Sequence, residues 1–365
     1  MTRTLPTPRR LPTWPQGTWP AVSFVMPVLN ERPYLEDAVA AVQHQEYAGD
    51  TELILALGPS TDGTTELAEQ IAARDPRVRL VRNPLANIPT GLNLAIAAAA
   101  NPVTIRVDAH SEIPPNYAHV GVDTLRRTGA ANCGGIMDAK GRSDYQRTVA
   151  RAYNSPLGLG GGAYHSGGEE GPCESAYLGI FRSEVLAEVS GYDDSVGRGE
   201  DWELNLRIRE AGYLVWFTPE LRVTYWPRDT RQRLARQFWS TGVWRGALVR
   251  DHRTRTPPRF FAPPALVAGL TVSVALGVTE GVRRLRGPAR VLRGVHLAPL
   301  AYASFLTLAA ARTPTTLRQR VRFAEVVAIM HTCWGAGFLA GLLRGGGQTV
   351  DTSRASKLQE QHPAP

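Results

Sequence analysis

Four side chains stand out because their types and spacing suit the chemistry of group transfer. Asp108 and His110 are two positions apart, with an alanine between them, and they directly follow a short apolar run. One oxygen donor and one nitrogen donor suit Mn²⁺ or Mg²⁺ bridging a phosphate, so this pair is a candidate metal site. Glu200 and Asp201 are adjacent carboxylates, and one carboxylate can take the proton from an attacking hydroxyl group. A solvated turn is the ordinary alternative for the first pair, and an acidic helix cap is the alternative for the second.

The elements that must position these side chains alternate along the first 110 residues. Short, nearly continuous apolar runs predict buried strands, and the stretches between them predict helices. This alternation is typical of an α/β fold, a mainly parallel sheet flanked by helices. The predicted strands are Ala21 to Val28, Glu52 to Leu57, Val78 to Val81 and Val103 to Val107, and the predicted helices are Pro33 to Gln45, Thr65 to Ala73 and Thr90 to Ala100.

Polar side chains follow three of these strands. Asn30 and Glu31 come after the first strand, Ser60 and Asp62 after the second, and the Asp108 pair after the fourth. In a parallel sheet, ligands bind at the carboxyl ends of the strands, where such loops meet. We therefore expect these side chains to form one site.

Other familiar motifs are absent from the sequence. It contains no Gly-x-x-x-x-Gly-Lys phosphate loop, no Gly-x-Ser-x-Gly elbow and no His-Glu-x-x-His helix. The run Gly158 to Ala163 formally matches a dinucleotide fingerprint but lacks a preceding strand, so we interpret it as a flexible active-site flap. Three widely spaced cysteines favour neither a disulfide framework nor a cysteine metal site, and they indicate a reducing compartment.

The net charge of +8 is unevenly distributed along the chain. Residues 1–220 hold 19 Lys and Arg against 27 Asp and Glu, whereas residues 221–346 hold 20 Arg against four acids. A basic block of this kind suits nucleic acid or an anionic membrane surface. The residues between the arginines are apolar, so we expect a membrane partner and no nucleic acid.

Three apolar stretches in the basic part predict membrane association. They are Ala262 to Thr279, Val295 to Ala311, and Phe323 to Leu343. The first has 18 uncharged residues, close to the minimum for a span, and the third carries Gly337 and Gly341 at the spacing that lets helices approach closely. Arginines in both intervening loops conflict with simple spanning, which leaves a helical hairpin or interfacial helices on the cytoplasmic face. Buried helices of a soluble domain are the alternative.

Four motifs in a fixed order resemble those of family 2 glycosyltransferases. They are Val22 to Arg32, Ser60 to Thr64, Asp108 to His110, and Gly199 to Leu204, within a resemblance that covers about residues 20–250. Members of this family are inverting, metal-dependent enzymes of the GT-A fold that use nucleotide sugars. The Asp-Ala-His variant and the tail His331 to Leu342 are similar to those of membrane-associated glucosyltransferases of succinoglycan-type polysaccharide assembly.

The resemblance implies a role for each matching residue. Asp108 and His110 hold the metal on the diphosphate, and Asp201, with Glu200 as the neighbouring candidate, is the catalytic base. Helical spacing after Asp201 also places that side chain near a helix N-terminus. The expected donor-binding residues are Pro27, Val28, Asn30, Glu31, Ser60, Asp62 and Asp108.

The sequence departs from the family pattern before the second motif. Leu57 and Gly58 stand where family members commonly carry acidic residues, one of which contacts the base of the nucleotide. We nevertheless expect UDP-linked sugars as donors, because backbone groups and the metal can hold the diphosphate.

On the acceptor side, we expect contributions from aromatic and basic residues. Trp202 follows the base, and Arg236 and Trp239 lie on a predicted amphipathic helix suited to a membrane surface. Core packing and a solvated basic face are the alternatives. The Gln-x-x-Arg-Trp motif of processive members is absent from this segment, so we expect one sugar to be added per encounter.

The sequence thus predicts four segments. A proline-rich tail (1–19) precedes a GT-A domain (20–255), a basic, apolar helical membrane-associated region (256–346) and a polar tail (347–365). The expected activity is inverting transfer of a sugar from a nucleotide donor to a lipid-linked or polysaccharide-precursor acceptor. The alternatives are a soluble glycosyltransferase with a small acceptor, and an inactive nucleotide-sugar-binding scaffold.

Overall fold

The computed structural model describes most of the chain. The described residues are 8–15, 17–159, 167–196, 199–252, 258–282, 293–313 and 315–345. Most of the predicted flap, residues 160–163, and the predicted tail 347–365 lie outside them.

The first half of the chain forms parallel strands joined by helices, as the sequence predicts. The strands lie side by side in the order β3-β2-β1-β4 and are parallel to one another. Every predicted element is present, with ends within two residues of the prediction. The elements are β1 (Val22–Val28), α1 (Arg32–Gln43), β2 (Thr51–Leu57), α2 (Thr64–Arg74), β3 (Val78–Arg82), α3 (Ile88–Ala98) and β4 (Val103–Arg106).

Helix α3 begins two residues before the predicted start. The side chain of Asn87 accepts a hydrogen bond from the Thr90 backbone N–H at 2.8 Å, and Pro89 lies in the first turn. A capping asparagine and an early proline together start a helix at this point, because the first turn does not need the missing N–H.

The second half of the chain extends the sheet with mixed strand directions. Within the described residues, nine strands form one sheet. Strand β8 lies between β4 and β6 and runs antiparallel to both, whereas β6 and β9 are parallel. The new elements are β5 (Ser111–Glu112), α4 (Tyr117–Thr128), β6 (Asn132–Ala139), α5 (Asp144–Tyr153), α6 (Pro156–Leu159), β7 (Gly171–Pro172), β8 (Tyr177–Arg182), α8 (Ser183–Glu188), α9 (Glu200–Glu210) and β9 (Val215–Tyr225).

Both faces of the sheet are buried, which explains the near-continuous apolar runs of its strands. In β1, Phe24 and Met26 belong to one core cluster, together with residues of α1 and α4. Val25, which points to the other face, belongs to a second cluster with residues of α3, α8 and α9. The mainly parallel α/β fold predicted from the sequence is confirmed.

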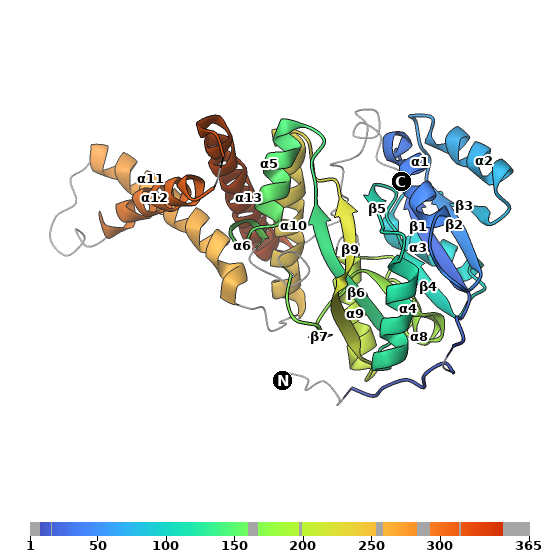
Figure 1. Ribbon diagram of the computed structural model, residues 1–365. Helices are drawn as coiled ribbons and strands as arrows, with labels where there is room; N and C mark the ends of the chain where they lie inside the picture. The colour runs from blue at the N-terminus through green and yellow to red at the C-terminus, as the bar shows by residue number, and fades with distance from the viewer. Residues whose placement is uncertain are drawn as a thin grey trace.

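The C-terminal part is helical and lies at the opposite end of the molecule from β1–β3 (Figure 1). Three of its helical segments, Pro258–Glu280, Arg293–Ala311 and Leu317–Arg344, are long and apolar enough to cross a membrane. In an 18-residue apolar stretch of each segment, the buried share is 44% for the third segment and 11% for each of the other two. The elements are α10 (Arg231–His252), η1 (Pro258–Phe261), α11 (Ala262–Val282), α12 (Leu297–Ala311) and α13 (Leu317–Arg344).

Glycines allow α13 to approach α10 closely. Added at Gly337 or Gly341 of α13, a Cβ atom would lie 2.2 or 2.0 Å from carbonyl oxygens of α10. Added at Gly242 or Gly246 of α10, it would lie 2.1 Å from carbonyl oxygens of α13. The predicted close approach at Gly337 and Gly341 is therefore present, and its partner is the helix that follows β9.

Candidate active site

The loops after β1 and β2 are joined by hydrogen bonds. Asn30 has φ of 54°, a left-handed conformation that asparagine tolerates better than most residues. Its backbone N–H donates to the Ser60 hydroxyl at 3.0 Å, and its side-chain oxygen accepts from the Thr61 N–H at 2.8 Å. The structure thus brings these two predicted donor-binding residues together.

Asp62 holds the same two loops. One carboxylate oxygen accepts from the Arg32 backbone N–H at 3.2 Å, and the other accepts from the Thr64 N–H at 3.1 Å. Val28 is 2% exposed, so its side chain belongs to the core. Donor contacts by Asp62 and Val28 stay predictions, and the Val28 carbonyl accepts from the Gly58 N–H at 2.8 Å.

His110 and Glu31 form the first polar pair of the site. The Nδ1 atom of His110 lies 2.9 Å from a carboxylate oxygen of Glu31, which is buried. A carboxylate accepts, so Nδ1 donates in this contact, and in the neutral ring that tautomer leaves the Nε2 lone pair for a ligand. A carboxylate that orients an imidazole in this way is typical of metal-ligating histidines.

Asp108 would supply the oxygen donor beside His110. Its side chain is 17% exposed. Throughout the described ranges, no set of three or more His, Cys, Asp and Glu side chains is arranged to hold a metal ion. Two protein ligands fit Mn²⁺ or Mg²⁺ when the phosphates of a substrate and water complete the shell.

A buried arginine that the sequence analysis missed joins both predicted pairs. Arg106, the last residue of β4, has a side chain that is 4% exposed. Its Nε lies 3.1 Å from Asp108, its Nη2 lies 3.1 Å from Glu200, and its Nη1 is paired with Asp201. One signal could have found it, because a charged residue ends a strand that is otherwise apolar or small.

Glu200 and Asp201 begin helix α9, as predicted, and both reach the same guanidinium. Burial raises the pKa of Asp201 to about 7, helped by the negative charges of Glu200 and Asp108 and opposed by Arg106. A carboxyl group with such a pKa can exchange a proton at neutral pH.

Helix α10 packs against the start of α9. Gly199, which precedes the carboxylates, has φ of 77°, and a Cβ there would lie 2.0 Å from the Trp244 ring. Trp202 packs edge-on against Trp244 at 6.4 Å, and the Arg245 guanidinium lies 5.6 Å from the Trp202 ring centre. The predicted acceptor residue Trp202 is therefore part of a contact between α9 and α10.

The other two predicted acceptor residues lie on the exposed side of α10. Arg236 is exposed and Trp239 is 45% exposed. A neighbour on α10, Gln237, donates to the Tyr225 hydroxyl at 3.2 Å, and the Tyr225 ring packs edge-on against His110 at 6.0 Å. Helix α10 thus supports the candidate metal ligand through Tyr225, which the sequence analysis also missed.

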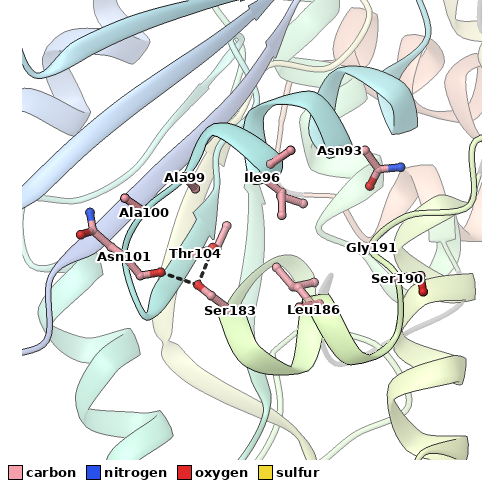
Figure 2. Close-up of a pocket in the computed structure, with 12 residues that line it drawn as sticks. Asn93, Ile96, Ala99, Ala100, Asn101, Thr104, Ser183, Leu186, Ser190 and Gly191 are labelled. Carbon is pink, nitrogen blue, oxygen red and sulfur yellow. Dashed lines mark hydrogen bonds between the residues drawn. The ribbon is translucent and has the colours of Figure 1, made fainter.

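Two cavities differ in chemistry. A cavity of about 260 Å³ lies over the loop after β1, lined by Asn30, Glu31 and Asp62 together with Arg228 and Arg233. A larger cavity of about 600 Å³ lies between α3, α8 and the start of β4. Its lining is mostly small and apolar, and Figure 2 shows one polar cluster there, Ser183 hydrogen-bonded to Asn101 and Thr104. The larger cavity contains none of the predicted site residues.

Comparison with known sequences identifies relatives of this chain. The pattern of the family described as "Glycosyl transferase family 2" matches residues 23–190. The succinoglycan biosynthesis protein ExoA of Rhizobium meliloti is 31% identical over 327 residues, which cover 88% of this chain and 94% of that protein. A Methanococcus voltae enzyme, dolichyl N-acetyl-α-D-glucosaminyl phosphate 3-β-D-2,3-diacetamido-2,3-dideoxy-β-D-glucuronosyltransferase, is 21% identical over 63% of this chain and 74% of its own length.

Comparison with solved structures supports the fold over nearly the whole chain. The mannosyltransferase PcManGT from Pyrobaculum calidifontis, in complex with GDP-Man and Mn²⁺, has a TM-score of 0.59 at 19% identity. The match covers 94% of this chain and 91% of that one, so it includes the C-terminal helices.

Proposed function

The chain belongs to glycosyl transferase family 2 and is a nucleotide-sugar glycosyltransferase, and from this premise we propose an inverting enzyme that transfers one sugar from a UDP-linked donor to a lipid-linked or polysaccharide-precursor acceptor. The observation that carries the proposal is the meeting of four charged groups beside the carboxyl end of β4. There Arg106 pairs with Asp108, Glu200 and Asp201, which brings the proposed donor side and the proposed base together.

In this proposal Asp201 is the general base. One oxygen, Oδ1, is engaged by Arg106, so the acceptor proton goes to Oδ2. As the acceptor oxygen forms its bond to the anomeric carbon, the bond from that carbon to the diphosphate breaks on the opposite face, and the configuration inverts. The pKa of about 7 keeps much of Asp201 ionised at neutral pH while making it a stronger base than an ordinary carboxylate.

Asp108 and His110 would hold Mn²⁺ or Mg²⁺. When bound, such an ion stabilises the negative charge that develops on the departing diphosphate. Support comes from the oriented imidazole of His110 and from the Mn²⁺ in the PcManGT complex.

The donor side is built from the joined loops after β1 and β2. Asn30, Ser60 and Asp62 order these loops, and the cavity beside them is the proposed place for part of the nucleotide. Leu57 removes the usual carboxylate contact to the nucleotide base, so recognition of UDP rests on backbone groups and on the diphosphate.

The lipid-linked acceptor is proposed from the position of the base. Helix α9 rests on α10 at Gly199, and α10 packs through glycines on α13, the third apolar helix. The basic segments beside α11, α12 and α13 suit an anionic cytoplasmic membrane face. The names of two relatives agree with this acceptor class, because ExoA is named for succinoglycan biosynthesis and the Methanococcus voltae glucuronosyltransferase is named for a dolichyl-linked sugar phosphate.

The proposal is tested by transfer of labelled sugar into membrane lipid extracts. Full-length protein with Mn²⁺ is given a panel of UDP-, GDP- and TDP-sugars, each with lipid extract or with small saccharides. We expect label from a UDP-sugar in the lipid fraction. Label found only in small saccharides supports the small-acceptor alternative instead. Use of GDP- or TDP-sugars overturns the UDP assignment. The absence of both sugar transfer and donor hydrolysis supports the inactive scaffold.

A further inference from the structure

Arg106 lies where the two halves of the proposed site meet. It lies on β4, two residues before Asp108, whereas Glu200 and Asp201 come from the start of α9, almost a hundred residues later. Each of its three guanidinium nitrogens faces a different carboxylate.

The burial of this group needs an explanation in energetic terms. A guanidinium that is 4% exposed loses its hydration, a cost recovered only when its N–H groups meet good acceptors. Burial lowers the pKa of Arg106, but the charges of Asp108, Asp201 and Glu200 raise it by more than burial lowers it. The guanidinium therefore stays charged. A planar fork of donors can serve three carboxylates at once, which a lysine ammonium cannot do with the same geometry.

The two sides of the cluster depend on Arg106 to different degrees. Asp108 is held by the same strand, because its neighbour Val107 donates a backbone hydrogen bond to Val25 of β1 at 3.0 Å. Asp201 is brought in by a separate helix, and Arg106 is its side-chain link to the sheet.

We propose that Arg106 is the positioning residue of the transfer reaction. Its guanidinium is anchored by Asp108 and fixes the carboxylate of Asp201, so that one oxygen of Asp201 faces the acceptor hydroxyl. This inference rests on the proposed function, since it takes Asp201 as the base. Holding a reacting group within a fraction of an ångström is worth large rate factors, and a displacement of about 1 Å can cost about 100-fold.

The test uses Arg106→Lys, which keeps the positive charge that the buried carboxylates need for folding, and Arg106→Met, which removes it. For Arg106→Lys we expect kcat to fall by about 10- to 100-fold, while the dissociation constant of the donor, measured with Mn²⁺ and UDP-sugar, stays within about threefold. Arg106→Met should be slower still. An Arg106→Lys enzyme with kcat within about threefold of wild type overturns the inference.

A matched control is available on the neighbouring strand. Arg182 of β8 is also buried, at 3% exposure, but it donates to the backbone carbonyls of Ala130 and Leu125 and lies against Trp14. Arg182→Lys should lower the melting temperature while leaving kcat within about threefold of wild type. An equal fall in kcat for both lysine variants overturns the inference, because it marks a general effect of disturbing the sheet.

A double-mutant cycle separates positioning of the base from an independent role. In an Asp201→Asn background, Arg106→Lys should cost less than about threefold further, because the group it positions no longer takes the proton. A full additional 10- to 100-fold loss overturns the inference. If Asp201→Asn itself transfers sugar at the wild-type rate, the proposed base fails instead, so the two failures are distinguishable.

Discussion

Replacement of Asp201 by asparagine probes the proposed base with little change of shape. The asparagine oxygen can still accept from Arg106, so the cluster with Asp108 and Glu200 should persist, but the amide nitrogen that replaces the other oxygen cannot take a proton. General base catalysis contributes about 10²- to 10⁴-fold, which corresponds to about 3 to 5 kcal/mol of barrier. We expect the transfer step to slow by that factor while the donor dissociation constant changes by less than about threefold, because Asp201 is not among the proposed donor-binding residues or metal ligands.

The assay is a single-turnover rate of sugar transfer, read beside donor binding and thermal unfolding. The pKa of Asp201 is raised by burial in the folded state, so its ionised form opposes folding, and stability falls as pH rises from the ordinary carboxyl range through about 7. Asp201→Asn removes this effect and should not lower the melting temperature at pH 8. Glu200→Gln is the control, because Glu200 contacts the same guanidinium. If Asp201→Asn transfers sugar at the wild-type rate, the assignment of Asp201 as the base is refuted. If Glu200→Gln is inactive at the same time, Glu200 is the base instead.

Three further predictions concern pH, metal and membrane. The single-turnover rate should rise with pH through about 7 and then level off, because Asp201 must be ionised to take a proton; a rate that is flat between pH 5 and 8 would contradict this. Asp108→Ala and His110→Ala should each weaken donor binding, measured by calorimetry, by about 10- to 100-fold in Mn²⁺ and by less than about threefold in EDTA. If either variant binds donor like wild type in Mn²⁺, the replaced residue is not a metal ligand. Full-length protein should float with anionic phospholipid vesicles. The double variant Val274→Asp with Leu300→Asp, at positions 68% and 66% exposed, should reduce flotation severalfold without loss of the helical circular dichroism signal. Unchanged flotation would mean that these two helix faces do not contact lipid.

The first half of the fold could be predicted because its signals are local. Each strand of β1 to β4 is a short apolar run followed by a polar loop, and buried parallel strands require that pattern. The mixed directions of β5 to β9 could not be predicted in this way. Strand β8 inserts between β4 and β6, and such pairings between distant segments depend on the course of the chain in three dimensions.

The candidate site shows the same division. The strand-end rule predicted that the loops carrying Asn30 and Ser60 meet, and they do. Arg106 was missed because a single arginine at a strand end has no spacing that identifies its partners, which come from the loop after β4 and from the start of α9. Glu200 and Asp201, which are adjacent at the start of a helix, both reach Arg106, because the guanidinium presents a separate nitrogen to each. The glycines Gly337 and Gly341 predicted a helix contact, but nothing in their spacing could name α10 as the partner.

The stereochemistry of the product tests the central claim most directly. Full-length wild-type enzyme is supplied with an α-linked UDP-sugar, Mn²⁺ and membrane lipid acceptor, and the new glycosidic linkage is assigned by proton NMR of the released saccharide. Attack by a hydroxyl that Asp201 deprotonates, on the face opposite the departing diphosphate, predicts a β-linked product. An α-linked product would mean retention of configuration and would contradict the mechanism built on Asp201 and Arg106.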